Sequence, residues 1–235
     1  MAIGNVTPDS FYAPSRLTDT DRVIAWAHSA LEDGADILDI GACSTRPGST
    51  LAPEEEEWRR LEPALKALRA ELPDAQLSVD TFRPEIARRA LDSFGPMIIN
   101  DISGGCQAMY DLVCAHEVPY VYTFSGAYNH LVILDHTPMK HVIIDLGLGF
   151  CGGVEQDYEC LRRMDELRSY NRPILVGISR KSMIWKPLGI TPDTSLTPTQ
   201  ALHLYALEHG ASILRVHDVA PARQTIQLYE MINGK

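Results

Sequence analysis

Short apolar runs alternate with longer amphipathic segments along nearly the whole chain. The runs are rich in Val, Ile and Leu, and turn residues bound each of them, as expected of parallel strands that are buried on both faces. Eight strands are predicted, over residues 2–6, 36–40, 77–80, 97–101, 119–122, 142–145, 174–178 and 213–216. Seven helices are predicted between and after them, over residues 19–32, 53–72, 84–91, 107–116, 154–168, 197–209 and 219–232.

The ends of several helices carry the residues that favour those positions. Thr18 and Asp19 precede the first helix, and Gly34 follows its end. Pro53 and the four glutamates after it place carboxylates at a helix N-terminus, where the helix dipole stabilises them. An eightfold βα alternation with right-handed crossovers closes most simply into a (β/α)8 TIM barrel. The competing open, doubly wound sheet is disfavoured because no G-x-G-x-x-G follows the first strand.

One segment departs from this alternation. Residues 123–140 contain no long amphipathic stretch, and residues 130–135 (HLVILD) have the composition of a strand. We therefore expect a barrel with a shortened or missing helix between strands five and six. The apolar strand surface there needs cover, either from this segment or from a partner chain.

Composition indicates a soluble globular protein with one domain, residues 1–235. The chain has 45% hydrophobic and 22% charged residues, and no Gly/Ser-rich or charged linker divides it. Its formal charge of -10, with no basic run, argues against a nucleic-acid surface. Without a signal peptide or a bilayer-spanning apolar run, a cytoplasmic location is expected. The cysteines form no C-x-x-C pair and are expected to be reduced, buried thiols: Cys43, Cys106, Cys114, Cys151 and Cys160.

Polar side chains follow almost every predicted strand. In barrels of this kind the carboxyl ends of the strands form one rim, where catalytic residues gather. Any one of these residues could instead cap the helix that follows it, but their number favours a ligand site. They are Asn5, Asp9, Ser44, Thr45, Arg46, Asp80, Asn100, Asp101, Asp145, Ser179, Arg180, Lys181, Arg215, His217 and Asp218.

Two kinds of chemistry are expected at this rim. The last two loops hold Arg180, Lys181, Arg215 and His217, which predict an anion or phosphate site; the alternative is a salt-bridge network with acids such as Asp218. The carboxylates Asp80 and Asp145, with the amide of Asn100, suit the N–H/NH2 edge of a pterin or guanine-like ring. The same oxygen atoms could instead bind magnesium.

Six motifs in register give the chain a family resemblance over nearly its whole length. They are NVTPDSF at 5–11, DIGACSTRPG at 39–48, SVDT at 78–81, INDI at 99–102, GISRKS at 177–182 and RVHDV at 215–219. Together they resemble the dihydropteroate synthase family, pterin-binding TIM-barrel enzymes of folate biosynthesis.

The resemblance implies an activity and a set of roles. The family condenses 6-hydroxymethyl-7,8-dihydropterin diphosphate with p-aminobenzoate, giving 7,8-dihydropteroate and pyrophosphate, with Mg2+ and commonly as a homodimer. By this resemblance Asn5 would contact the metal, while Arg215 and His217 would bind the diphosphate. Asp80, Asn100, Asp145 and Lys181 would hold the pterin. Thr45, Arg46 and Pro47 would close over p-aminobenzoate, with Ser179 and Phe150 near its other end. Lys181, Arg215, His217 and Asp145 are the expected catalytic residues.

The chain also departs from the family pattern. Thr123 and Phe124 stand where Met-His is usual, Leu146 replaces the proline of Asp-Pro-Gly, and the run 151–153 (CGG) replaces an expected lysine. These departures keep a second hypothesis open, a non-catalytic pterin-binding homologue or partner subunit. A pterin-dependent methyltransferase domain is a third, disfavoured because it does not need the cationic loops.

Overall fold

The computed structural model describes residues 1–7, 19–43, 51–124 and 141–234. Eight strands form one all-parallel sheet in the order β1 to β8. Their bounds are β1 Ala2–Asn5, β2 Ile37–Gly41, β3 Gln76–Asp80, β4 Ile98–Asp101, β5 Tyr120–Thr123, β6 Val142–Asp145, β7 Ile174–Val176 and β8 Ile213–Leu214. Each predicted strand is therefore confirmed, with ends that differ by no more than two residues.

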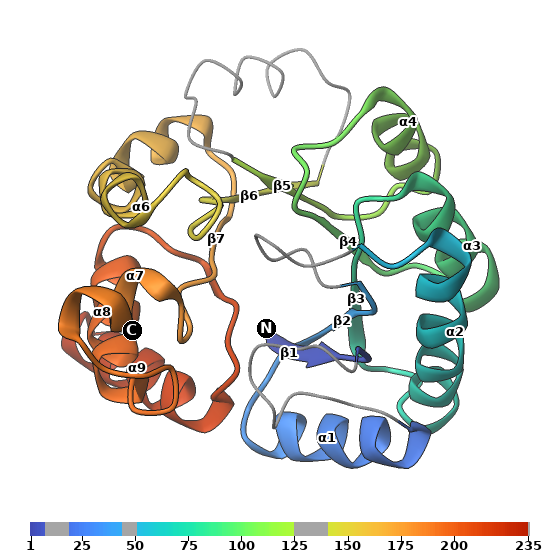
Figure 1. Cartoon of the computed structure of the whole chain (residues 1–235), viewed down its shortest axis with the longest axis horizontal. Coiled ribbons are helices and arrows are strands. Elements are labelled where there is room, and N and C mark those ends of the chain that lie inside the picture. The colour runs from blue at the N-terminus through green and yellow to red at the C-terminus, as the bar shows by residue number, and fades with distance from the viewer. Residues whose placement is uncertain (8–18, 44–50, 125–140, 235) are drawn as a thin grey trace.

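The sheet closes on itself where the first and last strands meet. Ala2 pairs in parallel with Val216. The Ile3 amide donates to the Val216 carbonyl at 3.0 Å, and the Val216 amide donates to the Met1 carbonyl at 2.9 Å. The strands consequently ring a central axis (Figure 1), which confirms the predicted TIM barrel.

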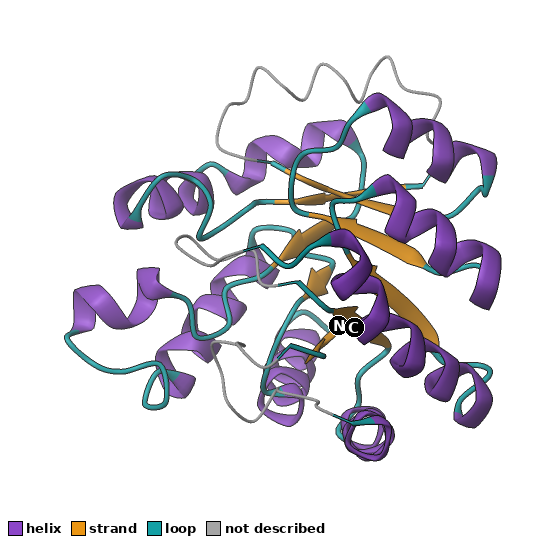
Figure 2. Cartoon of the chain, turned by 45° about the vertical axis from the view of Figure 1, so that its right-hand side comes forward, coloured by secondary structure: helices purple, strands orange, loops and turns teal. Residues whose placement is uncertain are grey.

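Helices lie outside the ring of strands and cover it (Figures 1 and 2). Their bounds are α1 Thr20–Glu32, α2 Glu54–Glu71, α3 Pro84–Phe94, α4 Gln107–Ala115, α6 Val154–Arg162, α7 Ser182–Leu188, α8 Leu196–Glu208 and α9 Val219–Ile232. The predicted capping is confirmed at α1, where the Asp19 side chain accepts from the Arg22 amide at 2.9 Å. None of the helices in the described ranges is long and apolar enough to cross a bilayer.

Two helical predictions need correction. The single helix predicted over residues 154–168 is instead α6 followed by a 3-10 helix, η3 Met164–Tyr170. The short helix α7 was not predicted, because seven residues that include Pro187 carry too little periodicity to be recognised. The predicted loss of a helix between β5 and β6 concerns residues that lie mostly outside the described ranges.

Inside the barrel, an apolar layer lies beneath a polar one. Five buried side chains form the apolar layer, and Ile37 and Ile213 pack against it: Met1, Ile98, Val121, Ile143 and Leu175. Side chains two residues apart on a strand point to the same face. The next inward positions along these strands are Asp39, Asn100, Thr123, Asp145, Gly177 and Arg215. The fold thus places a set of polar groups directly above a sealed apolar floor.

Candidate active site

Asp39 is the centre of the polar layer. Its side chain is completely buried. Oδ1 accepts a hydrogen bond from the hydroxyl of Ser78 at 2.6 Å. Oδ2 accepts from Asn100 Nδ2 at 3.1 Å and from Arg215 Nε at 2.7 Å. One carboxylate from β2 therefore orients side chains that come from β3, from β4 and from the end of β8.

Arg215 joins two carboxylates. Its Nη2 lies 2.6 Å from Oδ2 of Asp39 and 2.6 Å from Oδ2 of Asp80. Burial lowers the pKa of Arg215, but the neighbouring carboxylates of Asp39 and Asp80 outweigh burial and raise it, so the guanidinium stays charged. Burial raises the pKa of Asp80, and the charge of Arg215 opposes that rise. The predicted pterin carboxylate Asp80 and the predicted diphosphate ligand Arg215 are thus direct partners.

Asp145 faces the same layer from β6. Its Oδ2 accepts from the hydroxyl of Thr123 on β5 at 3.2 Å, a pairing that the register Thr123↔Asp145 brings about. Its Oδ1 is buried and has no hydrogen-bond partner in the described parts of the chain. Burial raises the pKa of Asp145, and nearby Lys181 opposes the rise. Burying a carboxylate oxygen without a hydrogen bond costs free energy, and a ligand's N–H group that donates to this atom would remove that cost.

Lys181 reaches this layer from the start of α7. Its Nζ donates to the carbonyl of Leu148 and lies 5.2 Å from the centroid of the Phe150 ring. Burial lowers the pKa of Lys181, while Asp145 raises it. The ammonium group therefore lies between the β6–α6 loop and the buried carboxylate.

Two glycines make room for that lysine. A Cβ at Gly177 would lie 3.7 Å from Lys181 Nζ and 4.0 Å from the Cβ of Arg215. Gly149 has a φ of +89°, and a Cβ there would lie 3.2 Å from Lys181 Cδ. Backbone without side chains therefore lines the path of Lys181 toward Arg215 and Asp145.

His217 and Ser179 connect the last two strand ends. The amide of His217 donates to the Ser179 hydroxyl at 3.2 Å. Burial, helped by the charge of Arg215, lowers the pKa of His217 to about 3. The imidazole is then neutral near pH 7 when no anion is bound, and the predicted role of His217 at an anion site stays a prediction. It can still offer a ring N–H.

Arg180 also differs from its predicted role. Its guanidinium binds Asp218 through two nitrogens, at 2.7 and 2.9 Å. Its Nη1 donates to the carbonyls of Pro192 and Asp193 at 2.7 and 2.9 Å. The alternative of a salt bridge with Asp218 is therefore correct for this residue. Arg180 anchors the loop before α8, and the cations of the polar layer are Lys181 and Arg215.

The remaining predicted residues have different outcomes. A Cβ at Gly4 would lie 2.7 Å from the Trp26 ring of α1, so Gly4 faces outward and the next residue, Asn5, faces inward. No three His, Cys, Asp or Glu side chains in the described ranges form a cluster that could hold a metal ion. The predicted substrate-loop residues lie outside the described ranges, as does Asp9: Thr45, Arg46 and Pro47.

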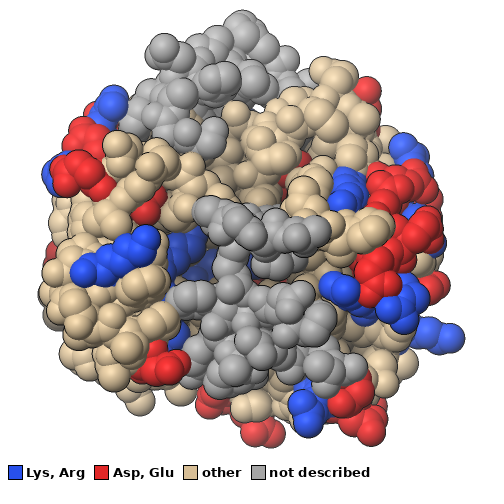
Figure 3. Space-filling view, viewed as in Figure 1, with Lys and Arg blue, Asp and Glu red and all other residues tan. Residues whose placement is uncertain are grey.

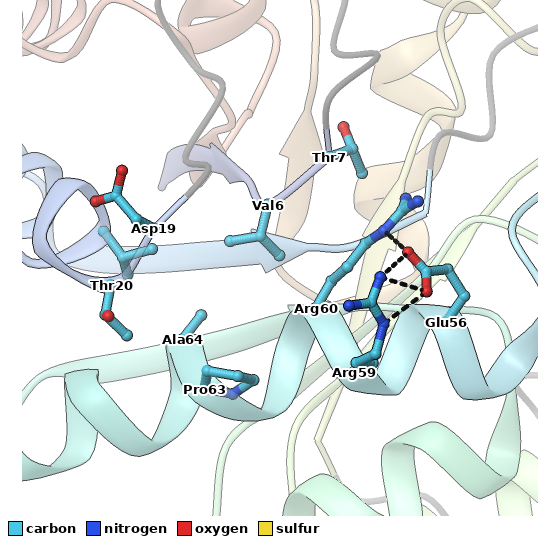
Figure 4. Close-up of a pocket in the computed structure, with 10 residues that line it drawn as sticks. Val6, Thr7, Asp19, Thr20, Glu56, Arg59, Arg60, Pro63 and Ala64 are labelled. Carbon is cyan, nitrogen blue, oxygen red and sulfur yellow. Dashed lines mark hydrogen bonds and ion pairs between the residues drawn. The ribbon is translucent and has the colours of Figure 1, made fainter.

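A separate cavity of about 470 Å³ lies beside the end of β1, between α1 and α2. Figure 4 shows Arg59 and Arg60 on its wall, both turned toward Glu56. Glu56 accepts from Arg59 Nε at 2.8 Å and from Arg60 Nε at 2.7 Å.

In Figure 3 other basic side chains are visible inside the central hollow, while the acidic ones lie mainly at the periphery. The polar layer, not this lateral cavity, carries the chemistry described above.

Comparison with known proteins identifies this arrangement. A family model described as "Pterin binding enzyme" matches residues 1–130 and 125–217. Dihydropteroate synthase of Streptococcus pyogenes serotype M3 is 33% identical over 240 residues, covering 93% of this chain and 90% of that protein. A probable bifunctional folylpolyglutamate synthase/dihydropteroate synthase of Haloferax volcanii is 35% identical over 93% of this chain, which spans 29% of that longer protein.

The structural comparison agrees with the sequence comparison. Xanthomonas albilineans dihydropteroate synthase, solved with 4-aminobenzoic acid, superimposes with a TM-score of 0.88 at 33% identity, covering 100% of this chain and 92% of that one. The match extends over the whole barrel, including the strands that carry the polar layer. The chain belongs to the dihydropteroate synthase family of pterin-binding enzymes.

Proposed function

We propose that the chain condenses 6-hydroxymethyl-7,8-dihydropterin diphosphate with p-aminobenzoate to form 7,8-dihydropteroate and pyrophosphate. The observation that carries this proposal is the polar layer of a family member, in which Asp145 keeps one buried oxygen unpaired beside Lys181. An unpaired carboxylate oxygen above an apolar floor suits the N–H/NH2 edge of a flat heterocycle. Asn100, oriented by Asp39, would contact the same ring from the next strand.

The reaction needs no nucleophile from the protein. The aniline nitrogen of p-aminobenzoate attacks the methylene carbon of the pterin while the carbon–oxygen bond to the diphosphate breaks. The bonding electrons leave with pyrophosphate, and the nitrogen loses a proton. Arg215 and Lys181 would stabilise the negative charge that develops on the leaving group, and neutral His217 would donate a hydrogen bond to it.

Magnesium belongs to the proposal as well. Mg2+ usually binds one or two protein oxygen ligands together with substrate phosphates. Asn5, which faces inward at the end of β1, offers an amide oxygen of the right kind. Asn5 would therefore hold the ion jointly with the diphosphate. The bound ion would add positive charge at the leaving group.

The departures from the family pattern do not favour the non-catalytic alternative. Thr123 stands at a position where the family usually has another residue, yet its hydroxyl holds Asp145 in place. The expected lysine after Phe150 is missing, but Lys181 contacts the Phe150 ring.

We also propose a cytoplasmic homodimer. Three exposed apolar side chains on one face of α9 are compatible with a partner: Leu228, Met231 and Ile232.

Purified protein given both substrates and Mg2+ tests the proposal. Pyrophosphate and dihydropteroate should appear in equal amounts, and neither should form without p-aminobenzoate. Calorimetric titration with the pterin diphosphate alone measures binding separately. Tight binding without pyrophosphate release would instead identify a non-catalytic pterin-binding protein. Sedimentation of the same sample measures the oligomeric state.

A further inference from the structure

A buried carboxylate connects α6 to the β6–α6 loop. Asp157 lies in the first turn of α6 and is only 2% exposed. Aspartate is rarely buried unless a partner compensates for the water that it loses. Here Oδ1 accepts a hydrogen bond from the backbone amide of Gly149 at 2.7 Å. An amide that donates to a carboxylate at this distance makes a strong bond, so Asp157 ties the loop to the helix.

The loop needs such an attachment because its backbone is unusually free. It runs from residue 146 to residue 153 and contains neither helix nor strand. Four of its residues are glycines with positive φ: Gly147, Gly149, Gly152 and Gly153. A glycine-rich segment has many accessible conformations and loses much entropy when it is fixed in one of them. The bond to Asp157 selects one conformation for the middle of the loop.

That conformation holds the lysine of the proposed active site. The carbonyl of Leu148, the residue before Gly149, accepts from Lys181 Nζ. The ring of Phe150, the residue after Gly149, lies 5.2 Å from the same nitrogen. A Cβ at Gly149 itself would lie 3.4 Å from Lys181 Nζ. The amide that Asp157 accepts from therefore lies between the two groups that contact the ammonium.

We propose that Asp157 is a positioning residue for Lys181. It fixes the β6–α6 loop so that the carbonyl of Leu148 and the ring of Phe150 hold the ammonium group in the polar layer. Asp157 bonds Gly149, which is not among the residues expected to bind substrate, so it acts through the loop and not on the substrates. Its effect on turnover rests on the proposed function.

The charge of Asp157 agrees with this role. Burial lowers the pKa of Lys181, and the carboxylate of Asp145 raises it; Arg215 lowers it further, and Asp157 raises it. Two carboxylates, one from β6 and one from α6, therefore favour the protonated lysine. The protonated form is the one that would stabilise the departing diphosphate.

Substitutions at Asp157 test the proposal. Asp157→Ala removes the acceptor of Gly149, and kcat for pyrophosphate release should fall by roughly tenfold to hundredfold, as expected when a catalytic group moves by about 1 Å. The Kd of the pterin diphosphate, measured by calorimetry, should change much less, because Asp80 and Asn100 come from β3 and β4 and not from this loop.

Two further variants separate positioning from a general loss of structure. Asp157→Asn keeps an oxygen in place of Oδ1, so it should restore most of the wild-type kcat. Glu155→Ala is the matched control, because Glu155 lies in the same first turn and its side chain is 82% exposed. It should keep the wild-type kcat.

Hydrogen–deuterium exchange measures the loop without turnover. Peptides over residues 146–153 should exchange on the order of tenfold faster in Asp157→Ala than in the wild type, because a hydrogen bond that protects the loop is lost. Asp157→Asn should exchange like the wild type. Peptides from β1 to β4 should exchange equally in all these proteins, which shows that the barrel is intact.

Three results would overturn the inference. One is a wild-type kcat in folded Asp157→Ala, and another is a loss of kcat that Asp157→Asn does not restore. The third is equal exchange over residues 146–153 in the wild type and Asp157→Ala. Should Asp157→Ala fail to fold, Asp157→Ser replaces it, because its polar side chain is too short to reach Gly149. If the wild type shows no turnover, the proposed function fails instead, and the exchange measurement still decides whether Asp157 fixes the loop.

Discussion

At the scale of single residues, Asp39 explains why the polar layer holds together. It was quoted as part of a motif but was not predicted to be a site residue, because it lies within an apolar strand rather than after it. Alternation along β2 could have identified it, since Ile37 faces the inner apolar layer and the residue two positions later faces the same way. Its three hydrogen-bond partners could not be predicted, because they depend on how four strands are aligned.

Asp39→Asn should reduce kcat/KM for the pterin diphosphate by roughly 10²-fold, because Arg215 loses one of its two carboxylates and Asn100 loses its acceptor. The variant keeps the shape of the side chain, so urea unfolding should show a folded protein. Ser78→Ala is the control, since it removes only a neutral donor to the same carboxylate. An unchanged kcat/KM for the pterin diphosphate in Asp39→Asn would show that Asp39 does not position these groups.

Lys181→Ala and Asp145→Ala should each nearly abolish turnover while the barrel stays folded. The reason is that the two side chains influence each other electrostatically in the polar layer, where the pterin would lie. Lys186→Ala, on the same short helix and exposed, should retain normal turnover. Circular dichroism checks the fold and pyrophosphate release checks the activity. Product formation at the normal rate by either active-site variant would refute the assignment.

At the scale of elements, hydrophobic pattern was enough to locate strands but not side-chain partners. All eight strands were predicted because each is a short apolar run between turn residues. The helix α7 was missed since it is too short to show a period. Arg180 was assigned to an anion site because it follows β7, and its true partner, Asp218, is 38 residues away in sequence. Which acid a strand-end arginine reaches depends on the path of the loop that follows the strand. The local sequence does not determine that path.

The packing of α8 against α9 contains a buried histidine that should make stability depend on pH. His203 is fully buried, its Nδ1 lies 3.2 Å from Gln200 Oε1, and burial lowers its pKa to about 4. Between pH 4 and about 6.5 the unfolded chain therefore binds more protons than the folded chain. The stability from neutral His203 is complete above pH 6.5 and is lost as the pH falls, up to about 3 kcal/mol.

Urea unfolding at pH 7 and pH 5 measures this contribution. The loss of unfolding free energy between the two pH values should be smaller in His203→Gln than in the wild type. Other titrating groups, such as His217 and Asp145, are the same in both proteins and cancel in the comparison. Equal losses in the wild type and His203→Gln would contradict the expectation.

At the scale of the whole molecule, the barrel reconciles an acidic protein with an anionic substrate. The formal charge is -10, yet Lys181 and Arg215 converge from the last two strand ends. Figure 3 shows basic groups beside the central hollow as well as at the periphery, where most of the visible acidic groups also lie. Lys181 and Arg215 thus bring positive charge to the polar layer, where it offsets the carboxylates of Asp39, Asp80 and Asp145 whatever the overall charge.

The apolar floor of the barrel also determines the path by which substrates reach the polar layer and products leave it. The interior below the polar layer is filled by apolar side chains, which close that end of the barrel among the described residues: Met1, Ile98, Val121, Ile143 and Leu175. In the described parts of the chain, the end of the barrel that is open to substrates and products is therefore the one that carries the polar layer. Asn100 and Asp145 lie directly above that floor, so the pterin would go in first and p-aminobenzoate would lie nearer the exit. Steady-state kinetics should accordingly show a compulsory order with the pterin binding first, and a random order would show that bound p-aminobenzoate does not block the path of the pterin.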